Sequence, residues 1–474
     1  MKYSTTTLTT QGRTASTRTP TPRPLAPTPP RGISRDSLTR LFTSNLASRS
    51  HHHPFTITAA MAEKPQDLVE NRHVEATLAK DKGPDARLLS WAIKDFTQKG
   101  DNMATAVTSV DVRYSLKDAD QRVSYVVKIN PMRKETQIDA FTCNLIKKEI
   151  HFHSVILPEL NEALTSAGFE KLRIPTFYFA ETEPGRELLF FEDLRDRGFR
   201  MTDRKKGLDA AHANLVLKEL ARFHATSHVL LARNGDLTDR YPLLKTDFAT
   251  STGQQREFLQ GMFGSHLTPA VNLLQEVEGY DSVLQWAIRT QQNVMDVLRD
   301  QVTDGASPFK LMCHGDCYSN NLLFRYDATG APVEAMLLDL QVTRYASLAT
   351  DLSYLLLTSL GGSVISSSAQ DFLNAYYTSF SAVTEAAGHP VPFSFKDLQE
   401  EFRNKLPIGL LFGLIVHPYV VMSSADMPEA EVFLSDHDKA EVKQKILHAL
   451  DNNPLLRPRL LSVCDYVIRA GVVD

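Results

Sequence analysis

The chain has 474 residues, of which 42% are hydrophobic and 23% charged, an ordinary globular composition that excludes collagen, coiled-coil and mostly disordered proteins. Its 52 Lys and Arg against 56 Asp and Glu give a net charge of −4, so no uniform positive field favours nucleic acid or an anionic membrane. We expect neither as a partner, and no obligate protein partner. The 4 cysteines form no CxxC pair and no dense disulfide framework, which favours a reducing compartment and predicts a cytoplasmic protein.

Residues 1–60 differ in composition from the rest of the chain. They hold seven Arg and one Lys but a single acidic residue, Asp36, and they are crowded with Ser, Thr and Pro. Such a segment cannot bury enough apolar surface to offset its ordering entropy, so we expect a disordered leader. Its Arg-rich, acid-poor character also suits an organelle transit peptide, and Met61 is an alternative functional start. The sequence does not choose among a transit peptide, a tail and a gene-model extension.

The pattern of the next part of the chain, residues 61–194, predicts a small sheet. We expect a helix over residues 87–99 at its start. Alternating apolar and polar residues then predict four strands, at 106–114, 123–129, 176–181 and 187–193. The turn signal Glu183-Pro184-Gly185 separates the last two strands. An antiparallel sheet with one long helix follows from this order.

Two charged residues in this part fall on unusual faces. Lys128 lies opposite the apolar stripe of its strand, where a cation needs water or an anionic partner. Residues 136–156 have helical spacing, and Glu149 falls within their apolar stripe. Because a buried carboxylate is costly unless it is paired, Lys128 is its candidate partner. The alternative is that Glu149 lies at the edge of the stripe and faces water.

The remainder, residues 195–474, is mainly helical. Helical periodicity covers residues 214–231, 284–300, 369–385 and 442–450. The most hydrophobic stretch, residues 406–422, is interrupted by two prolines and a histidine and is too short for a membrane span, so it predicts a buried core helix. A sheet lobe followed by a helical lobe leaves a cleft, which is the expected ligand site.

The candidate catalytic residues concentrate around one predicted hairpin, with strands at 322–326 and 333–338. Asp316 lies in the polar loop before it, Asn321 follows five residues later, and Asp339 ends the returning strand. Three hard oxygen donors without a Cys/His set favour magnesium over zinc. The spacing D-x-x-x-x-N followed by a strand-end Asp is typical of kinases, and this donor set suits phosphoryl transfer.

Four runs resemble the ecdysteroid kinase-like family, also called CHK kinase-like, which is related to choline kinases and aminoglycoside phosphotransferases: CHGDCYSNNLLFRY, LLDLQVTRYASLATDLSYLL, FFEDLRDRGFRMTDRKKGLD and LKELARFHATS. The resemblance extends from about Leu88 to the C-terminus. It implies an α+β, bilobal protein-kinase-like fold with a small antiparallel-sheet N-lobe and a larger, mainly helical C-lobe. It also implies an ATP- and Mg²⁺-dependent phosphotransferase with an alcohol group as acceptor.

The resemblance also implies roles for individual residues. Asp316 matches the catalytic base, and Asn321 and Asp339 match the magnesium ligands. Lys128 matches the lysine that holds the nucleotide phosphates, with Glu149 as its ion-pair partner.

Two further segments match the nucleotide site of the family. Phe191, Glu192, Asp193 and Leu194 fall where the interlobe hinge would bind adenine through its backbone. The phosphate-covering loop reads GDNMATAVTS, in which Gly100, Asp101 and Asn102 fit the family pattern. Since Gly100 is its only glycine, phosphate contact would depend on few backbone amides.

The remaining polar residues near the motif are expected to be supporting. His314 would brace the loop by hydrogen bonds, and Asp351, after the possible helix N-cap Thr350, would steady it. We expect His224 to be a hydrogen-bonded core histidine. Cys313 and Cys317 are interpreted as packing neighbours, because nothing near them in sequence would lower a thiol pKa.

Two hypotheses for function follow. The first is a small-molecule kinase that phosphorylates an ecdysteroid hydroxyl, a hydroxylated xenobiotic, or choline or ethanolamine. The second is a catalytically silent kinase-like module that binds a nucleotide or a sterol and regulates a partner. The intact set of candidate residues favours the enzyme. The sequence leaves the acceptor, the oligomeric state and the physiological role open.

Overall fold

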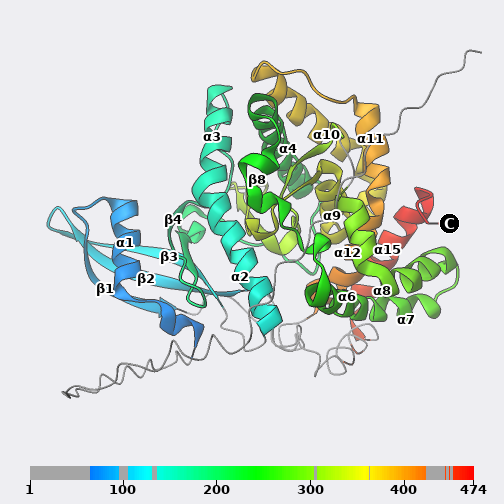
Figure 1. Cartoon of the computed structure of the whole chain (residues 1–474), viewed down its shortest axis with the longest axis horizontal. Coiled ribbons are helices and arrows are strands. Elements are labelled where there is room, and N and C mark those ends of the chain that lie inside the picture. Colours follow the sequence, from blue (N-terminus) through cyan, green and yellow to red (C-terminus); the bar gives the residue numbers. More distant parts are fainter. Residues whose placement is uncertain are drawn as a thin grey trace, which may run out of the picture. The chain divides into compact units, whose positions relative to one another are not determined.

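The computed structural model describes residues 64–94, 105–130, 136–303, 307–361, 363–422, 444, 448 and 452–473. The predicted leader, residues 1–60, lies outside these ranges. Residues Met61–Asp474 form one compact unit, in which a five-stranded antiparallel sheet is followed by a mostly helical part (Figure 1). This confirms the predicted α+β class with a small sheet lobe and a larger helical lobe.

The N-lobe contains the sheet and, among the described residues, five helical segments. The sheet order is β1-β2-β3-β5-β4, with every neighbouring pair antiparallel. In Figure 1, α2 and α3 lie between the sheet and the helical part. The elements are η2 (Pro65–Leu68), α1 (Asn71–Lys82), β1 (Arg87–Lys94), β2 (Ala106–Leu116), β3 (Ala119–Ile129), α2 (Thr136–His151), the π-helical turn η3 (Phe152–Ile156), α3 (Leu157–Ser166), β4 (Phe177–Glu181) and β5 (Leu188–Glu192).

The prediction of a helix over residues 87–99 is wrong. Residues 87–94 form β1, which pairs antiparallel with β2 at the edge of the sheet. The run RLLSWAIK has apolar residues at spacings that suit either a helix or a strand, and pairing with β2 decides between them. The helix that precedes the sheet is α1, which the sequence analysis did not predict.

Strand β3 places its side chains as its alternation predicts. Tyr125, Val127 and Ile129 are fully buried in the N-lobe core, together with residues of β2 and α1. Lys128 points to the opposite face of the sheet, because successive side chains of a strand alternate. Its partner position on β5 is Leu189, so the lysine lies in the central part of the sheet.

The C-lobe contains most of the helices and two small hairpin-like sheets, in which β6 pairs with β9 and β7 with β8. The predicted helical segments at 214–231, 284–300 and 369–385 lie within α4, α8 and α10, whereas residues 442–450 lie outside the described residues except for 444 and 448. The elements are η4 (Leu194–Arg197), α4 (Ala210–Asn234), α5 (Leu237–Arg240), η5 (Pro242–Lys245), η6 (Phe248–Thr250), α6 (Gly253–His266), α7 (Thr268–Gln275), α8 (Asp281–Val302), β6 (Lys310–Cys313), η7 (Ser319–Asn321), β7 (Leu322–Tyr326), β8 (Pro332–Leu337), η8 (Leu340–Val342), β9 (Arg344–Ser347), α9 (Leu348–Ser359), α10 (Val364–Ala386), α11 (Phe395–Asn404), α12 (Leu406–Val421) and α15 (Leu456–Arg469).

Helices α9 and α12 form the centre of the C-lobe. Every residue of α9 is buried, and α12 is the predicted core helix. Gly409 and Gly413 let the two helices approach closely, since a Cβ on Gly409 would lie 2.6 Å from the carbonyl oxygen of Ser353. Among the described residues no single helix is long and apolar enough to cross a membrane, and α11 and α12 pass that test only together, with a 49° bend between them.

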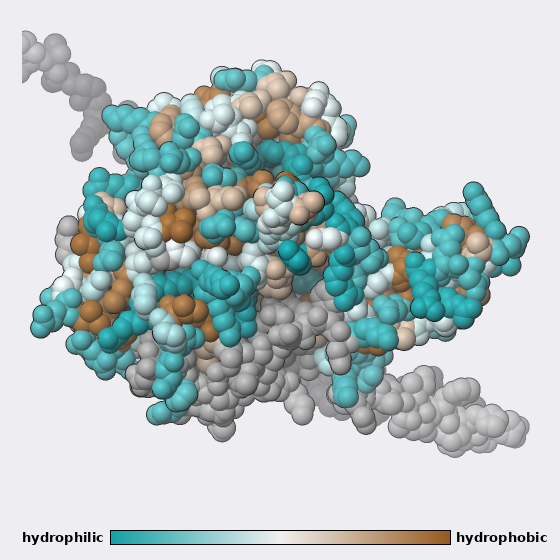
Figure 2. Space-filling model, turned by 180° about the vertical axis from the view of Figure 1, so that it is seen from behind, coloured by the Kyte–Doolittle hydropathy of each residue, from teal (hydrophilic) through white to brown (hydrophobic). Residues whose placement is uncertain are grey.

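The surface of the described residues is mostly polar. The face in Figure 2 shows hydrophobic residues in small areas separated by hydrophilic ones. Only four large hydrophobic side chains of the described residues are exposed, and they lie far apart in the sequence: Leu89, Val155, Val333 and Leu455. Single exposed hydrophobic side chains of this kind are normal for a globular protein.

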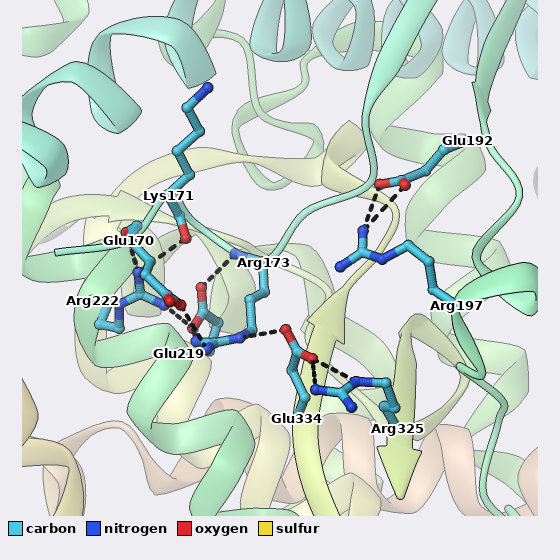
Figure 3. Close-up of polar contacts among 9 residues, drawn as sticks. All are labelled: Glu170, Lys171, Arg173, Glu192, Arg197, Glu219, Arg222, Arg325 and Glu334. Carbon is cyan, nitrogen blue, oxygen red and sulfur yellow. Dashed lines mark hydrogen bonds and ion pairs between the residues drawn. The ribbon is translucent and has the colours of Figure 1, made fainter.

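Hydrogen bonds connect the segment between α3 and β4 to the C-lobe. The backbone N–H of Arg173 donates to Glu219 of α4 at 2.7 Å, and its guanidinium donates to Glu334 of β8 at 2.8 Å (Figure 3). The carbonyl oxygen of Arg173 accepts from the N–H of Leu337. Because Glu219 is buried in this network, the connection is fixed by charge-assisted hydrogen bonds.

Candidate active site

A cavity of about 340 Å³ lies where the two lobes meet. Its walls come from the sheet, from α2, from the segment after β5 and from the β7–β8 hairpin. Eight of the predicted site residues line it: Lys128, Glu149, Phe191, Glu192, Asp193, Leu194, Asn321 and Asp339. Residues more than two hundred positions apart in the chain therefore share one cavity, as the sequence analysis expected of the interlobe cleft.

Lys128 is held by two carboxylates. Its Nζ lies 2.6 Å from Glu149 Oε2 and 2.8 Å from Asp339 Oδ1, so the predicted Lys128–Glu149 ion pair is present. Burial alone would lower the pKa of Lys128, but the attraction of Asp339 and Glu149 outweighs it and raises the pKa. The lysine stays charged, and it joins β3 of the N-lobe to the end of the C-lobe hairpin.

Glu149 is the buried member of this group. Only 1% of its surface is exposed, and burial raises its pKa to about 7 although Lys128 opposes the shift. Its place on α2, in the apolar stripe, is the one that the helical spacing predicted. The second explanation, that Glu149 faces water, is excluded by this burial.

Asp339 has a strained backbone. Its φ of 64° and ψ of 63° fall in the left-handed region, which non-glycine residues rarely adopt. Such strain, of order 1–3 kcal/mol, is typical of functional sites. It turns the chain sharply between β8 and η8, and the carboxylate, 17% exposed, faces Lys128 and the cavity.

Asn321 contacts Asp316 through its amide nitrogen. Nδ2 donates to the backbone oxygen of Asp316 at 2.9 Å and to its Oδ2 at 3.0 Å. With both hydrogens of the amide engaged, the carbonyl oxygen of Asn321 is the atom left for a metal ion. Asn321 and Asp339 both line the cavity, so the two predicted magnesium ligands are brought together there.

Asp316 does not itself line the cavity, but it lies in residues 314–321, called the catalytic loop after its predicted role, and contacts Asn321, which does line it. Its Oδ1 accepts a hydrogen bond of 2.6 Å from the phenol of Tyr354, on α9. Burial raises the pKa of Asp316 to about 7, and the negative charge of Asp339 adds to the shift. A carboxyl with a pKa near neutrality can accept a proton from an alcohol and release it again.

Asp351 fixes the backbone of the catalytic loop. Its Oδ2 accepts from the N–H of His314 at 2.6 Å, and its Oδ1 from the N–H of Gly315 at 2.9 Å. His314 in turn is buried, with its pKa lowered by burial, and its Nδ1 accepts from the N–H of Asp316. Both residues thus occupy the supporting positions predicted for them.

Thr350 is not the N-cap of the helix that carries Asp351. Helix α9 begins at Leu348, and Ser347 is the N-cap, with its hydroxyl accepting from the N–H of Ala349. Strand β9 ends at Ser347, so the chain enters the helix directly, and Thr350 falls in the first helical turn.

His224, Cys313 and Cys317 are packing residues, as predicted. The imidazole of His224 is buried between Tyr376, whose hydroxyl lies 2.7 Å from Nδ1, and Asp351, whose Oδ2 lies 3.1 Å from Nε2. Burial raises the pKa of both thiols well above the usual range, so neither is a nucleophile at neutral pH.

The predicted hinge lies along one wall of the cavity. Phe191, Glu192, Asp193 and Leu194 all line it. The carboxylate of Asp193 caps η4 by accepting from the N–H of Arg195, and Glu192 pairs with Arg197 at 3.1 Å (Figure 3). The side chains are therefore engaged in holding the segment, and binding of adenine by its backbone stays a prediction. Gly100, Asp101 and Asn102 of the phosphate-covering loop lie outside the described residues.

The sequence analysis missed His153, Arg344 and Tyr354, among other residues of the site. His153, on the π-helical turn η3, lines the cavity beside Phe191, with ring centroids 4.9 Å apart. Arg344 donates to the carbonyl oxygen of Gly315 at 2.9 Å, and Tyr354 contacts Asp316. Helical spacing could have indicated two of them. His153 is four residues after Glu149 on one helical face, and Tyr354 is three residues after Asp351.

Comparison with known proteins identifies the family. Residues 99–389, more than half of the chain, match the ecdysteroid kinase-like family. The chain belongs to this family. It is accordingly a phosphotransferase that acts on a hydroxyl group, and its class is that of a small-molecule kinase.

Solved structures give more distant likenesses, and no curated protein matches. The GDP and kanamycin complex of APH(2")-IIia shares 10% identity over 85% of this chain and 99% of that chain, with a TM-score of 0.34. Ethanolamine kinase from Plasmodium vivax shares 12% over 83% and 87%, with a TM-score of 0.32. A thermostable mutant of the aminoglycoside phosphotransferase APH(4)-Ia shares 12% over 84% and 99%, with a TM-score of 0.31.

Proposed function

We propose that this kinase transfers the γ-phosphate of ATP, bound with Mg²⁺, to a hydroxyl group of an ecdysteroid-like or other small alcohol. One observation carries the proposal: Lys128, Asp339 and Asn321 surround one cavity, and Asn321 is hydrogen-bonded to the candidate base Asp316. Phosphoryl transfer needs a cation on the phosphates, oxygen ligands for a metal and a carboxylate near the acceptor.

The oxygen donors fit a magnesium ion. Asn321 keeps its carbonyl oxygen for a metal because its amide nitrogen is engaged with Asp316. Asp339 contacts Lys128 through Oδ1, which leaves Oδ2 for a metal. An amide oxygen and a carboxylate are ligands that Mg²⁺ accepts, with nucleotide phosphates and water completing the coordination. The ion would neutralise phosphate charge that develops during transfer.

The chain's own residues would divide the work of transfer. Lys128 would hold the phosphates, as a cation fixed at the boundary of the two lobes. The acceptor hydroxyl would donate its proton to Asp316 while its oxygen bonds to the γ-phosphorus. The bond between that phosphorus and the bridging oxygen would break, and ADP would leave.

Aromatic rings pack around the Tyr354 phenol that contacts Asp316. The ring of Tyr354 lies 4.8 Å from that of Phe412 and 6.2 Å from that of Tyr318, measured between centroids. Aromatic surfaces stabilise apolar ligands, and they also attract quaternary ammonium groups. Sterols and choline therefore both belong in the test.

The test measures ADP release by the full-length chain with ATP and Mg²⁺ across a panel of acceptors. The panel contains ecdysone, other hydroxylated sterols, choline, ethanolamine and simple alcohols. We expect acceptor-dependent ADP release that falls about 10²- to 10⁴-fold in Asp316→Asn, the contribution usual for a general base. Asp465→Asn is the matched control, because Asp465, on α15, also accepts a phenol hydrogen bond but lies outside the catalytic loop. Unchanged turnover in Asp316→Asn would exclude this residue as the base.

A further inference from the structure

The contact between Tyr354 and Asp316 has the geometry of a catalytic support. We propose that Tyr354 is a positioning residue for phosphoryl transfer, whose phenol holds the carboxylate of Asp316 in the orientation that meets the acceptor hydroxyl. The inference rests on the proposed function, because Tyr354 acts only through the base.

The two oxygens of Asp316 are held from different elements. Oδ1 accepts from the Tyr354 hydroxyl at 2.6 Å, and Oδ2 accepts from Asn321 Nδ2 at 3.0 Å. Hydrogen bonds to an ionised carboxylate are stronger than those between neutral groups. Two such bonds, one to each oxygen, fix the rotation of the carboxylate. One lone pair on each oxygen remains, so the carboxylate can still receive the acceptor proton.

Tyr354 is itself held in place. Its ring packs on Phe412 of α12, and only 6% of the residue is exposed. The close approach of α9 to α12, which Gly409 permits opposite Ser353, sets the position of the neighbouring Tyr354. A phenol on a buried helix is a precise support, since its helix cannot move without repacking the core.

Helix α9 therefore supports the catalytic loop at three points along its length. Asp351 accepts from two backbone amides of the loop, Tyr354 donates to the side chain of Asp316, and Ser359 accepts from the N–H of Ser319 through its hydroxyl. Asp351 and Ser359 fix the backbone. Tyr354 is the one of these three that contacts the candidate base itself.

The phenol remains a donor under all ordinary conditions. Burial raises the pKa of Tyr354 well above its usual value, and the charge of Asp316 raises it further. Tyr354 therefore takes no proton from the acceptor, and its effect is to orient Asp316.

The experiment compares Tyr354→Phe with the full-length parent. The substitution removes the hydroxyl and keeps the ring that packs on Phe412. Tyr280→Phe is the matched control, because the Tyr280 hydroxyl donates to a carboxylate, Asp465, at 2.8 Å, and this pair joins the start of α8 to α15, outside α9 and the catalytic loop. ADP release is measured with the acceptors of the panel and also without any alcohol, with water as acceptor. Melting temperatures are recorded, and the rates are compared below every melting temperature.

We expect Tyr354→Phe to lower kcat about 10- to 100-fold, the effect of losing one hydrogen bond to a charged group, with the KM for ATP changed less than about twofold. Tyr280→Phe should leave both constants unchanged. A kcat within about twofold of the parent would overturn the proposal. A KM for ATP that rises by the same factor as kcat falls would also overturn it, because a purely structural defect would disturb the whole cavity.

The outcome separates this inference from the proposed function. If Asp316→Asn loses turnover and Tyr354→Phe keeps it, the function stands and the positioning role falls. If Asp316→Asn keeps turnover, or if the parent releases no ADP with any acceptor or with water, both proposals fall together.

Discussion

The two sides of the interlobe cavity are built differently. On the N-lobe side, Lys128 of β3 is held by two carboxylates, one from α2 and one from the end of the β7–β8 hairpin. On the C-lobe side, one helix, α9, holds the catalytic loop through hydrogen bonds to its backbone and to Asp316. The first side joins parts that meet across the cleft, whereas the second fixes the loop within one packed core.

Because of this difference, we expect ATP binding to depend on the N-lobe side of the cavity and the chemical step to depend on the C-lobe side. When one charge of an ion pair across the cleft is removed, the other charge is left buried without a partner, and this lowers the free energy of unfolding. A loop held by a buried helix keeps its backbone when a single hydroxyl is removed. We therefore expect substitutions on the N-lobe side to change ATP binding and stability, and those on the C-lobe side to change kcat.

The largest effect is expected at Asp339, where the two sides meet. Asp339→Asn would remove the carboxylate proposed as a metal ligand, which is also one of the two charged partners of Lys128. Turnover should fall by on the order of 10³, because a metal ion on a transferring phosphate contributes several kcal/mol. Steady-state rates at increasing Mg²⁺ measure it. Asp327→Asn, in the exposed turn of the same hairpin, is the control and should keep parental rates. Equal rates for the two variants would contradict a metal role for Asp339.

Lys128→Met should act on both ATP binding and stability. The KM for ATP should rise about 10- to 100-fold, since a charged hydrogen-bond donor is lost from the phosphate site. Unfolding free energy should fall by about 3–5 kcal/mol, because Glu149 is left buried without its partner.

A double variant separates these two effects. Lys128→Met with Glu149→Gln removes the buried charge and should regain most of the stability in urea unfolding without regaining ATP affinity. Recovery of ATP affinity in the double variant would show that Lys128 is a structural residue only.

The smallest effect is expected at His153 and only in acid. Burial, with the nearby charge of Lys128, lowers the pKa of His153 to about 3 from its ordinary 6.5. Between those values the unfolded chain takes up a proton that the folded chain does not, so this histidine makes the folded state less stable as the pH falls. His153→Phe should reduce the acid sensitivity of the unfolding free energy by about 3 kcal/mol near pH 4 relative to pH 7. Parallel pH dependences of parent and variant would show that the folded protein takes up this proton as readily as the unfolded chain.

Sequence reasoning predicted the parts of the site that local patterns determine. The alternation of β3 placed Lys128 off its apolar stripe, and the helical spacing of α2 placed Glu149 inside, so their pairing followed. The hairpin that separates Asn321 from Asp339 indicated that the two would meet, because a hairpin brings its two ends together, and both line the cavity. Family resemblance supplied the roles of these residues, and the structure supplies their contacts.

Contacts that depend on packing between distant elements were not predictable. Tyr354 reaches Asp316 only because α9 packs against α12 at Gly409, and a helical period does not report which helix lies beside another. Strand β1 was mistaken for a helix because pairing with β2, and not local propensity, determines its conformation. The left-handed backbone of Asp339 likewise has no signature in a run of residues that contains no glycine.

Calorimetric titration of ATP into the full-length chain, with and without Mg²⁺, tests the central claim most directly. If Lys128, Asn321 and Asp339 surround one nucleotide–metal complex, one ATP binds per chain with Mg²⁺, and chelation of the metal weakens the binding by at least tenfold. Equal affinity with and without Mg²⁺, or no ATP binding in either condition, would contradict the account.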